Sequence, residues 1–179
     1  MVDHFSGGTP VVPAVERGPG DAQFVQRALG WQVRRLDARP GIFVHEDELG
    51  VLNEEGAFEI YATPSTPNKL DGSPQPGWVT RYVPASGDGP TDVVELGDDH
   101  AKEILVDDVD GDGRDELYVS IEAVEGGRLE IRRYDAGTDP AAGRIVARLP
   151  DRLCRFLTAG DLEGDGIADG CRARGKRAA

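Results

Sequence analysis

The sequence predicts an all-β protein made of short antiparallel strands, and three features lead to this prediction. The chain contains 24 glycines and 12 prolines among 179 residues, which suits a fold with many turns. Several short segments alternate apolar and polar side chains with a period of two, as half-buried strands do. Two loops carry carboxylates and glycines at fixed spacing, and the first runs directly into a β-prone segment at 117–121.

The first of these loops is a candidate calcium site. Counted from its first ligand, it offers carboxylates at positions 1, 3, 5 and 9 and a backbone carbonyl at position 7: Asp108, Asp110, Asp112, Glu116 and Arg114. Clustered carboxylates repel one another unless a cation lies among them, and Ca²⁺ takes about six to eight oxygens at roughly 2.3–2.6 Å. Gly113 allows the sharp turn that brings both halves of the loop to one point.

The second loop repeats the pattern further along the chain, at 161–169. Its ligands at positions 1, 3, 5, 7 and 9 are Asp161, Glu163, Asp165, the carbonyl of Ile167, and Asp169. Two such loops in one frame indicate a supersecondary repeat. We therefore expect two Ca²⁺ ions per chain.

An EF-hand does not account for these loops, because it requires a glutamate at position 12 and a helix on each side. Position 12 is Val119 in the first loop and Arg172 in the second. The segment after the first loop is β-branched and aromatic, which favours a strand.

A carboxylate loop that leads into a strand resembles the FG-GAP/VCBS repeats of integrin-like β-propellers. Residues 108–117 match that motif throughout, whereas the second copy has Gly170 where the family has Leu or Ile. The resemblance covers about residues 31–170. It implies an incomplete β-propeller of about two to two and a half four-stranded blades with calcium-binding hairpin loops. It implies fold and calcium binding more than any activity.

A third and weaker copy lies upstream. Residues 51–61 align with residues 108–118 without a gap. Positions 3, 5 and 9 are Asn53, Glu55 and Glu59, but Val51 at position 1 cannot ligate a metal. We expect no ion at this loop.

The repeats divide the chain into expected units at 21–57, 58–115 and 116–170. In the last unit, periodicity predicts four strands that would form one blade, at 117–123, 129–134, 144–149 and 154–159, with a turn at 125–127. Residues 63–77, rich in Pro, Ser and Asn, are expected to form a surface loop. The terminal segments, 1–20 and the basic 171–179, are expected to be disordered.

Composition excludes several functions. A net charge of −13 and a pI near 4.6 argue against nucleic acid and anionic membranes as partners. No apolar run is long enough for membrane insertion, and no signal peptide is evident. Calcium loops suit extracellular calcium levels, so we expect an extracellular or cell-surface location. Cys154 and Cys171 could form a disulfide, or remain a buried residue and a free thiol.

No catalytic residue is predicted. His4, His45 and His100 lie in unrelated contexts, His45 is expected in a solvated loop, and no catalytic motif occurs. The leading hypothesis is a non-catalytic, calcium-stabilised propeller module that acts as a scaffold or as a protein- or glycan-binding surface. The alternative is an accessory propeller domain of a secreted carbohydrate-active enzyme. Uncovered blade faces would require self-association or additional blades from a longer parent chain.

Overall fold

The computed structural model describes residues 35–53, 55–67, 69, 71, 73–124, 128–150, 153–161, 164 and 171–176, with backbone alone at 123–124 and 171–176. The chain divides into two units, residues 1–40 and 41–179. All of the described strands lie in the second unit. Among the described residues, no helix is long and apolar enough to cross a membrane.

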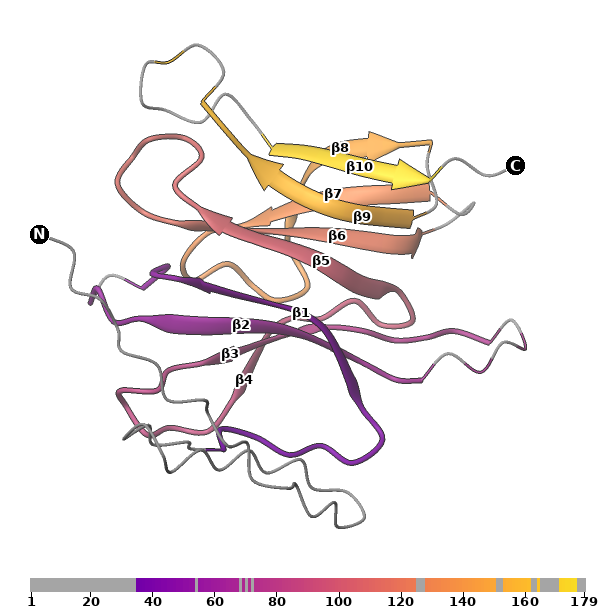
Figure 1. Cartoon of the computed structure of the whole chain (residues 1–179), viewed down its shortest axis with the longest axis horizontal. Helices are drawn as coiled ribbons and strands as arrows, with labels where there is room; N and C mark the ends of the chain where they lie inside the picture. The colour runs from indigo at the N-terminus through magenta and orange to yellow at the C-terminus, as the bar shows by residue number, and fades with distance from the viewer. Residues whose placement is uncertain are drawn as a thin grey trace, which may run out of the picture. The chain divides into compact units, whose positions relative to one another are not determined.

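The described strands form two four-stranded antiparallel sheets and one two-stranded sheet (Figure 1). Consecutive strands are neighbours in each sheet, so the chain proceeds by hairpins. The first sheet contains β1 (Phe43–Gly50), β2 (Glu59–Ser65), β3 (Val79–Tyr82) and β4 (Thr91–Val94). The second contains β5 (His100–Asp107), β6 (Glu116–Val124), β7 (Arg128–Tyr134) and β8 (Arg144–Leu149), and the third contains β9 (Leu153–Ala159) and β10 (Cys171–Lys176). The predicted all-β class is confirmed.

The four strands predicted between residues 116 and 170 are confirmed. They correspond to β6, β7, β8 and β9, and each differs from its predicted range by at most one residue at either end. Period-two alternation was sufficient to find them because each strand has apolar side chains that are buried or partly buried, as Ala147 and Leu149 are on β8. The turn predicted at 125–127 lies outside the described residues.

The sheets begin one strand earlier than the expected repeat units. The first acidic loop closes a hairpin between β5 and β6, so the strand before the loop belongs to the same sheet as the strand after it. Consequently β9 does not complete the β6–β8 sheet but pairs with β10. The loop expected at 63–77 is also shorter than predicted, because β2 continues through Ser65, which forms a β-bridge with Gly77.

The prediction of a disordered C-terminal segment is wrong for Cys171–Lys176, which pair with β9 as strand β10. Small residues alternate with arginines from Cys171 to Arg174, which is a strand pattern that the basic composition concealed. Cys171 pairs with Ala159 while Cys154 pairs with Gly175, and Cys154 is a buried free cysteine. The expected disordered segment 1–20 and residues 177–179 lie outside the described residues.

The first two sheets share one hairpin geometry, and it follows the gapless alignment of their sequences. The β1–β2 register shifts between Val44 and Asp47, and the β5–β6 register shifts at the corresponding place, between Ala101 and Ile104. Each bulge is held by a hydroxyl from the partner strand. The Glu46 N–H donates to Thr63 Oγ1 at 2.9 Å, and the Glu103 N–H donates to Ser120 Oγ at 3.0 Å. The internal repeat is therefore present in the structure as well as in the sequence.

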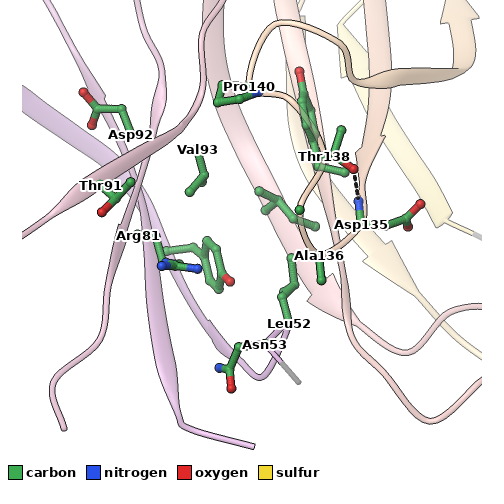
Figure 2. Close-up of a pocket in the computed structure, with 14 residues that line it drawn as sticks. Leu52, Asn53, Arg81, Thr91, Asp92, Val93, Asp135, Ala136, Thr138 and Pro140 are labelled. Atoms are coloured by element: carbon green, nitrogen blue, oxygen red, sulfur yellow. Dashed lines mark hydrogen bonds between the residues drawn. The ribbon is translucent and has the colours of Figure 1, made fainter. Parts of the chain in front are cut away.

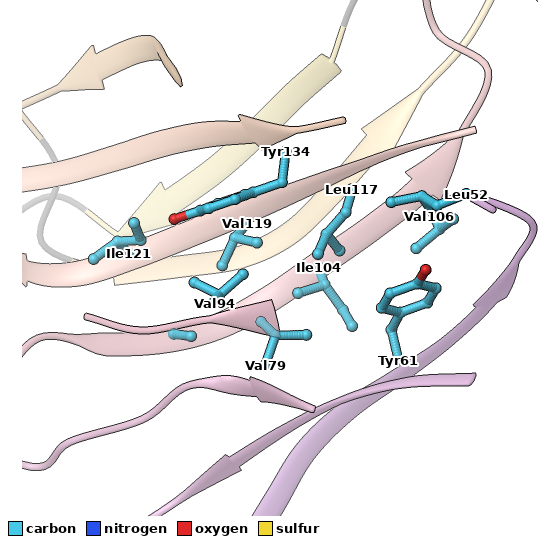
Figure 3. Packing of buried hydrophobic residues seen from close by; sticks show 11 residues of the cluster. Leu52, Tyr61, Val79, Val94, Ile104, Val106, Leu117, Val119, Ile121 and Tyr134 are labelled. Carbon is cyan, nitrogen blue, oxygen red and sulfur yellow. The ribbon is translucent and has the colours of Figure 1, made fainter. Parts of the chain in front are cut away.

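Two apolar clusters connect the sheets. The first lies between the two four-stranded sheets and includes Tyr61, Val79, Ile104 and Leu117 (Figure 3). The second joins the other face of the β5–β8 sheet to β9, through residues that include Val109, Tyr118, Leu129, Ile131, Cys154 and Leu157. Alternation along β6 supplies both clusters, because successive side chains point to opposite faces. Strand β6 of this sheet is thus buried on both faces.

A glutamate also links the first two sheets. The Ile104 N–H on β5 donates to Glu46 Oε2 on β1 at 2.7 Å. Burial raises the pKa of Glu46 to about 7, against the opposing effect of that hydrogen bond, and the neighbouring Glu103 raises it further. Because the folded state holds this proton more tightly than the unfolded chain, Glu46 costs stability as the pH rises from about 4.5 through about 7.

Replacing Glu46 by glutamine should remove this pH dependence. The amide oxygen can still accept from Ile104, and no charge forms at high pH. We expect Glu46→Gln to unfold with a free energy about 1 kcal/mol above wild type at alkaline pH, a value reduced because the site is only half-buried. At a pH below about 4.5 the two proteins should be equally stable, because Glu46 is then protonated in both the folded and the unfolded chain. Urea unfolding at a pH below about 4.5 and at a pH above about 7 measures this, with the exposed Glu95→Gln as control. An equal difference at both pH values would contradict it.

Candidate metal centre

The carboxylates of the first acidic loop converge at the end of the β5–β6 hairpin. Asp108, Asp110, Asp112 and Glu116 each place one oxygen so that all four lie within 4.8 Å of one another. Oxygens bound to one Ca²⁺ at about 2.3–2.6 Å lie at most roughly 5 Å apart. The four residues predicted from spacing therefore come together in a geometry that one such cation could bridge.

The backbone explains why this loop gathers its carboxylates. Gly111 and Gly113 have φ of 72° and 88°, in the left-handed region that glycine adopts without strain. The Gly113 N–H donates to Asp108 Oδ2, and the Arg114 N–H donates to Asp112 Oδ1, both at 2.9 Å. These bonds fold the loop back on itself. Arg114, expected to offer its carbonyl, lies at this turn.

One carboxylate oxygen of the cluster is a buried acceptor. Asp108 Oδ1 accepts no hydrogen bond from the part of the chain that the structure describes. A buried acceptor without a donor costs about 1–3 kcal/mol, and more when it is charged. A cation among the four carboxylates would satisfy this oxygen, so the residues present fit a metal ion.

Glu116 forms the base of the cluster and is 2% exposed. Its Oε2 accepts from the Val109 N–H at 3.2 Å and from the Tyr118 hydroxyl at 3.4 Å. Burial raises the pKa of Glu116, and Arg133 opposes that change. A divalent cation among these carboxylates would favour the ionised form of Glu116, as the positive charge of Arg133 does.

Arg133 on β7 is the functional residue that the sequence analysis missed. Its guanidinium contacts Asp110 Oδ2 at 2.7 Å and Glu116 Oε1 at 3.3 Å, and its Nε donates to Asp135. The hydrogen bond from Arg133 lowers the pKa of Asp110. Burial lowers the pKa of Arg133, but its carboxylate partners outweigh this and the net shift is upward. Arg133 therefore neutralises part of the cluster's charge from outside the loop.

The upstream copy keeps this framework without its acidic loop. Glu59, 1% exposed, accepts from the Leu52 N–H at 3.2 Å and from the Tyr61 hydroxyl at 2.5 Å, and contacts Arg81 Nη1 at 3.4 Å. These partners stand where Val109, Tyr118 and Arg133 stand around Glu116. The gapless alignment of the two segments is confirmed by these equivalent contacts.

Asn53 takes the place of Asp110 in this upstream loop. Its Oδ1 accepts from the N–H groups of Glu55 and Ala57, each at 3.0 Å, and its Nδ2 donates to the Ala57 carbonyl at 2.6 Å. The amide closes the loop through hydrogen bonds where the downstream copy presents a carboxylate. That this loop binds no ion remains a prediction, and the use of the Asn53 amide in hydrogen bonds within the loop supports it.

The second predicted calcium loop is largely outside the described residues. Of its ligands only Asp161 is described, and its Oδ1 accepts from the Gly164 N–H at 2.5 Å. Glu163, Asp165, Ile167 and Asp169 lie outside the described residues. The second Ca²⁺ thus remains a prediction.

Two histidines expected in unrelated contexts are brought together. The rings of His45 and His100 meet edge to face with centroids 5.0 Å apart, and His45 Nε2 lies 3.0 Å from Ser65 Oγ. His45 belongs to strand β1 rather than to a loop. Burial, aided by the nearby His45, lowers the pKa of His100 to about 4. The pair lies on strands of neighbouring sheets, a relation that separate sequence contexts could not reveal.

Comparison with known proteins identifies no relative. No family model, no curated protein and no solved structure matches this chain. The resemblance to FG-GAP/VCBS repeats therefore rests on the loop spacing and on the internal repeat.

Calcium should stabilise the protein through the downstream loop. A ligand that binds only the folded state adds about 2.7 kcal/mol at a hundredfold excess over its Kd. We expect the melting temperature to rise with Ca²⁺, and Asp112→Asn to reduce that rise. Glu55→Gln, at the same position of the upstream loop, is the matched control and should leave it unchanged. Calorimetry with and without a chelator measures both, and an identical response of the two variants would contradict the assignment.

The two buried glutamates should respond differently to substitution. Glu59→Gln and Glu116→Gln each disturb a buried, charge-assisted network, so each should lower the free energy of unfolding by about 1–3 kcal/mol in a chelator. Only Glu116→Gln should also weaken calcium binding. Denaturant unfolding and calcium titration of both variants separate the effects. An equal loss of calcium affinity in both would show that Glu116 acts only through the fold.

Proposed function

We propose that this chain is a non-catalytic, calcium-stabilised repeat module of the β-propeller type, acting as a scaffold or as a binding surface for protein or glycan. The observation that carries the proposal is the repeated hairpin, built from the aligned segments 51–61 and 108–118, with carboxylates converging on one copy. Supersecondary repeats of this kind are typical of propeller blades and other stacked units. Because the carboxylates of the downstream loop converge, that loop has the oxygen ligands that a cation requires.

The sheet arrangement supports the propeller type. A propeller blade is a four-stranded antiparallel sheet, and successive blades pack face to face. Here two four-stranded sheets and the start of a third follow one another along the chain, and apolar clusters join them in order. The first strands of the first two sheets are neighbours, since Ile104 of β5 bonds to Glu46 of β1.

Calcium fits the candidate metal centre better than magnesium or a softer metal. All of the converging side chains are carboxylates, without histidine or cysteine. Soft metals prefer sulfur and nitrogen, and Mg²⁺ commonly keeps several waters rather than a full set of protein ligands. Sites of this kind suit calcium concentrations outside the cell, so an extracellular or cell-surface location is part of the proposal.

The outer sheets present apolar side chains that a further blade could cover. Phe43, Val44 and Leu49 on β1 are 58%, 57% and 52% exposed, and Phe156 on β9 is 67% exposed. A closed propeller takes about four or more blades. Other copies of this chain, or additional blades of a longer parent chain, would supply the missing sheets.

Self-association should follow if these faces are not covered otherwise. We expect the chain in millimolar calcium to form oligomers, because exposed apolar strands favour association. Leu49→Asp combined with Phe156→Asp should shift it toward monomer, whereas Val146→Asp on β8 is the matched control. Light scattering coupled to size exclusion measures the mass. A monomeric wild type with one cooperative unfolding transition would contradict the blade count.

A further inference from the structure

A cavity of about 330 Å³ lies between the first two sheets. It is bounded by β2–β4 on one side and by the end of β7 and the following loop on the other (Figure 2). Its wall is mixed. Leu52, Val93 and Pro140 supply apolar surface, while Arg81 and Asp92 supply charge. This volume stands at the lower end of the range of small-molecule sites.

Arg81 is less fully paired than its counterpart in the next sheet. Of its guanidinium nitrogens, Nη1 contacts Glu59, while Nε is buried and has no hydrogen-bond partner among the described residues. Arg133 instead directs Nε, Nη1 and Nη2 to three carboxylates: Asp135, Asp110 and Glu116. A buried guanidinium N–H without an acceptor is costly, so a partner from outside the chain would be favourable.

The internal alignment of the two sheets explains this difference. Tyr82 pairs with Ile60 as Tyr134 pairs with Leu117, so Val83 stands in the place of Asp135. Asn53 stands in the place of Asp110, and its amide is used within its own loop. The two acceptors that Arg133 contacts at these positions are therefore absent around Arg81. The cavity borders the Arg81 side chain.

Charge narrows the class of ligand. Glu59 already balances Arg81, and Asp92 and Asp135 also line the cavity in a chain of net charge −13. An anionic ligand would be repelled by these carboxylates, and a cationic ligand would be repelled by Arg81. An uncharged ligand with acceptor oxygens can receive the arginine N–H groups without adding charge. The apolar residues of the wall can pack against its carbon–hydrogen faces.

We propose that this cavity binds a neutral, hydroxyl-bearing ring, a single pyranose unit of a glycan, with Arg81 donating to its oxygens. This inference rests on the proposed binding-surface function and assigns it a site and a ligand class. The ring's apolar face would lie against Leu52, Val93 and Pro140, the apolar part of the cavity wall. Two of its oxygens would take the role that Asp110 and Asp135 take for Arg133.

The test uses the full chain in millimolar calcium and a panel of methyl glycopyranosides of glucose, galactose, mannose, fucose and N-acetylglucosamine, with methyl glucuronide as the anionic comparison. Saturation-transfer NMR reports contact of each sugar, and the Arg81 Nε–H resonance reports its environment. We expect at least one neutral glycoside to bind and to shift that resonance. No binding of any neutral glycoside, or binding of the glucuronide alone, would overturn the proposal.

Variants locate the site. Arg81→Lys keeps a charge beside Glu59 but lacks Nε–H, and should weaken binding about tenfold, the loss of one good hydrogen bond. Ala136→Trp fills the cavity from an exposed loop position, and should abolish binding without disturbing Glu59. Ala141→Trp, exposed in the same loop and outside the cavity wall, is the matched control. Undiminished binding to Ala136→Trp would place the sugar elsewhere and overturn the proposal.

A calcium melting experiment on the same variants separates the two proposals. Calcium stabilisation that persists in Ala136→Trp, together with absent sugar binding in wild type, would reject the cavity ligand alone. Sugar binding without any effect of calcium would reject the calcium module alone.

Discussion

The fold depends on a buried glutamate at the first position of the second strand in each four-stranded sheet. Glu59 and Glu116 are almost completely buried, and each holds the preceding hairpin loop through a backbone N–H. A charge in that position is costly unless it is paired and hydrogen-bonded, so each glutamate requires an arginine from the third strand. Arg81 and Arg133 meet that requirement. One constraint thereby ties the loop to the second and third strands of each sheet.

The two copies share this buried glutamate–arginine pair but differ in the hairpin loop around it. Around Glu116 the loop adds carboxylates until the local charge exceeds what Arg133 can neutralise, which favours a divalent cation. Around Glu59 the loop closes through the amide of Asn53, and the Arg81 Nε–H has no acceptor among the described residues. One copy has an excess of negative charge, and the other has an N–H donor without an acceptor among the described residues. These two features are the basis on which we propose a cation for the first copy and a neutral, oxygen-rich ligand for the second.

Packing between the sheets is consistent with a repeating stack. The centre of the β5–β8 sheet is covered on both faces, by the first cluster on one side and by β9 on the other. The hydrogen bond from Ile104 to Glu46 adds a polar link whose strength depends on pH, because burial keeps that carboxyl protonated to about pH 7. The exposed phenylalanines of β1 and β9 have no equivalent cover among the described residues. The strands β1 and β9 therefore expose apolar side chains of the kind that are buried between the sheets.

The sequence by itself determined the strands β6–β9, the four converging carboxylates and the gapless alignment of the two hairpins. These features depend on local periodicity and on ligand spacing along one loop, which the chain carries in order. Only the tertiary structure decided that β9 leaves the preceding sheet for β10, that Arg133 joins the acidic cluster, and that Arg81 borders a cavity. Each of these depends on which distant segments become neighbours. Burial and hydrogen bonding settle that choice, and residue order alone leaves it open.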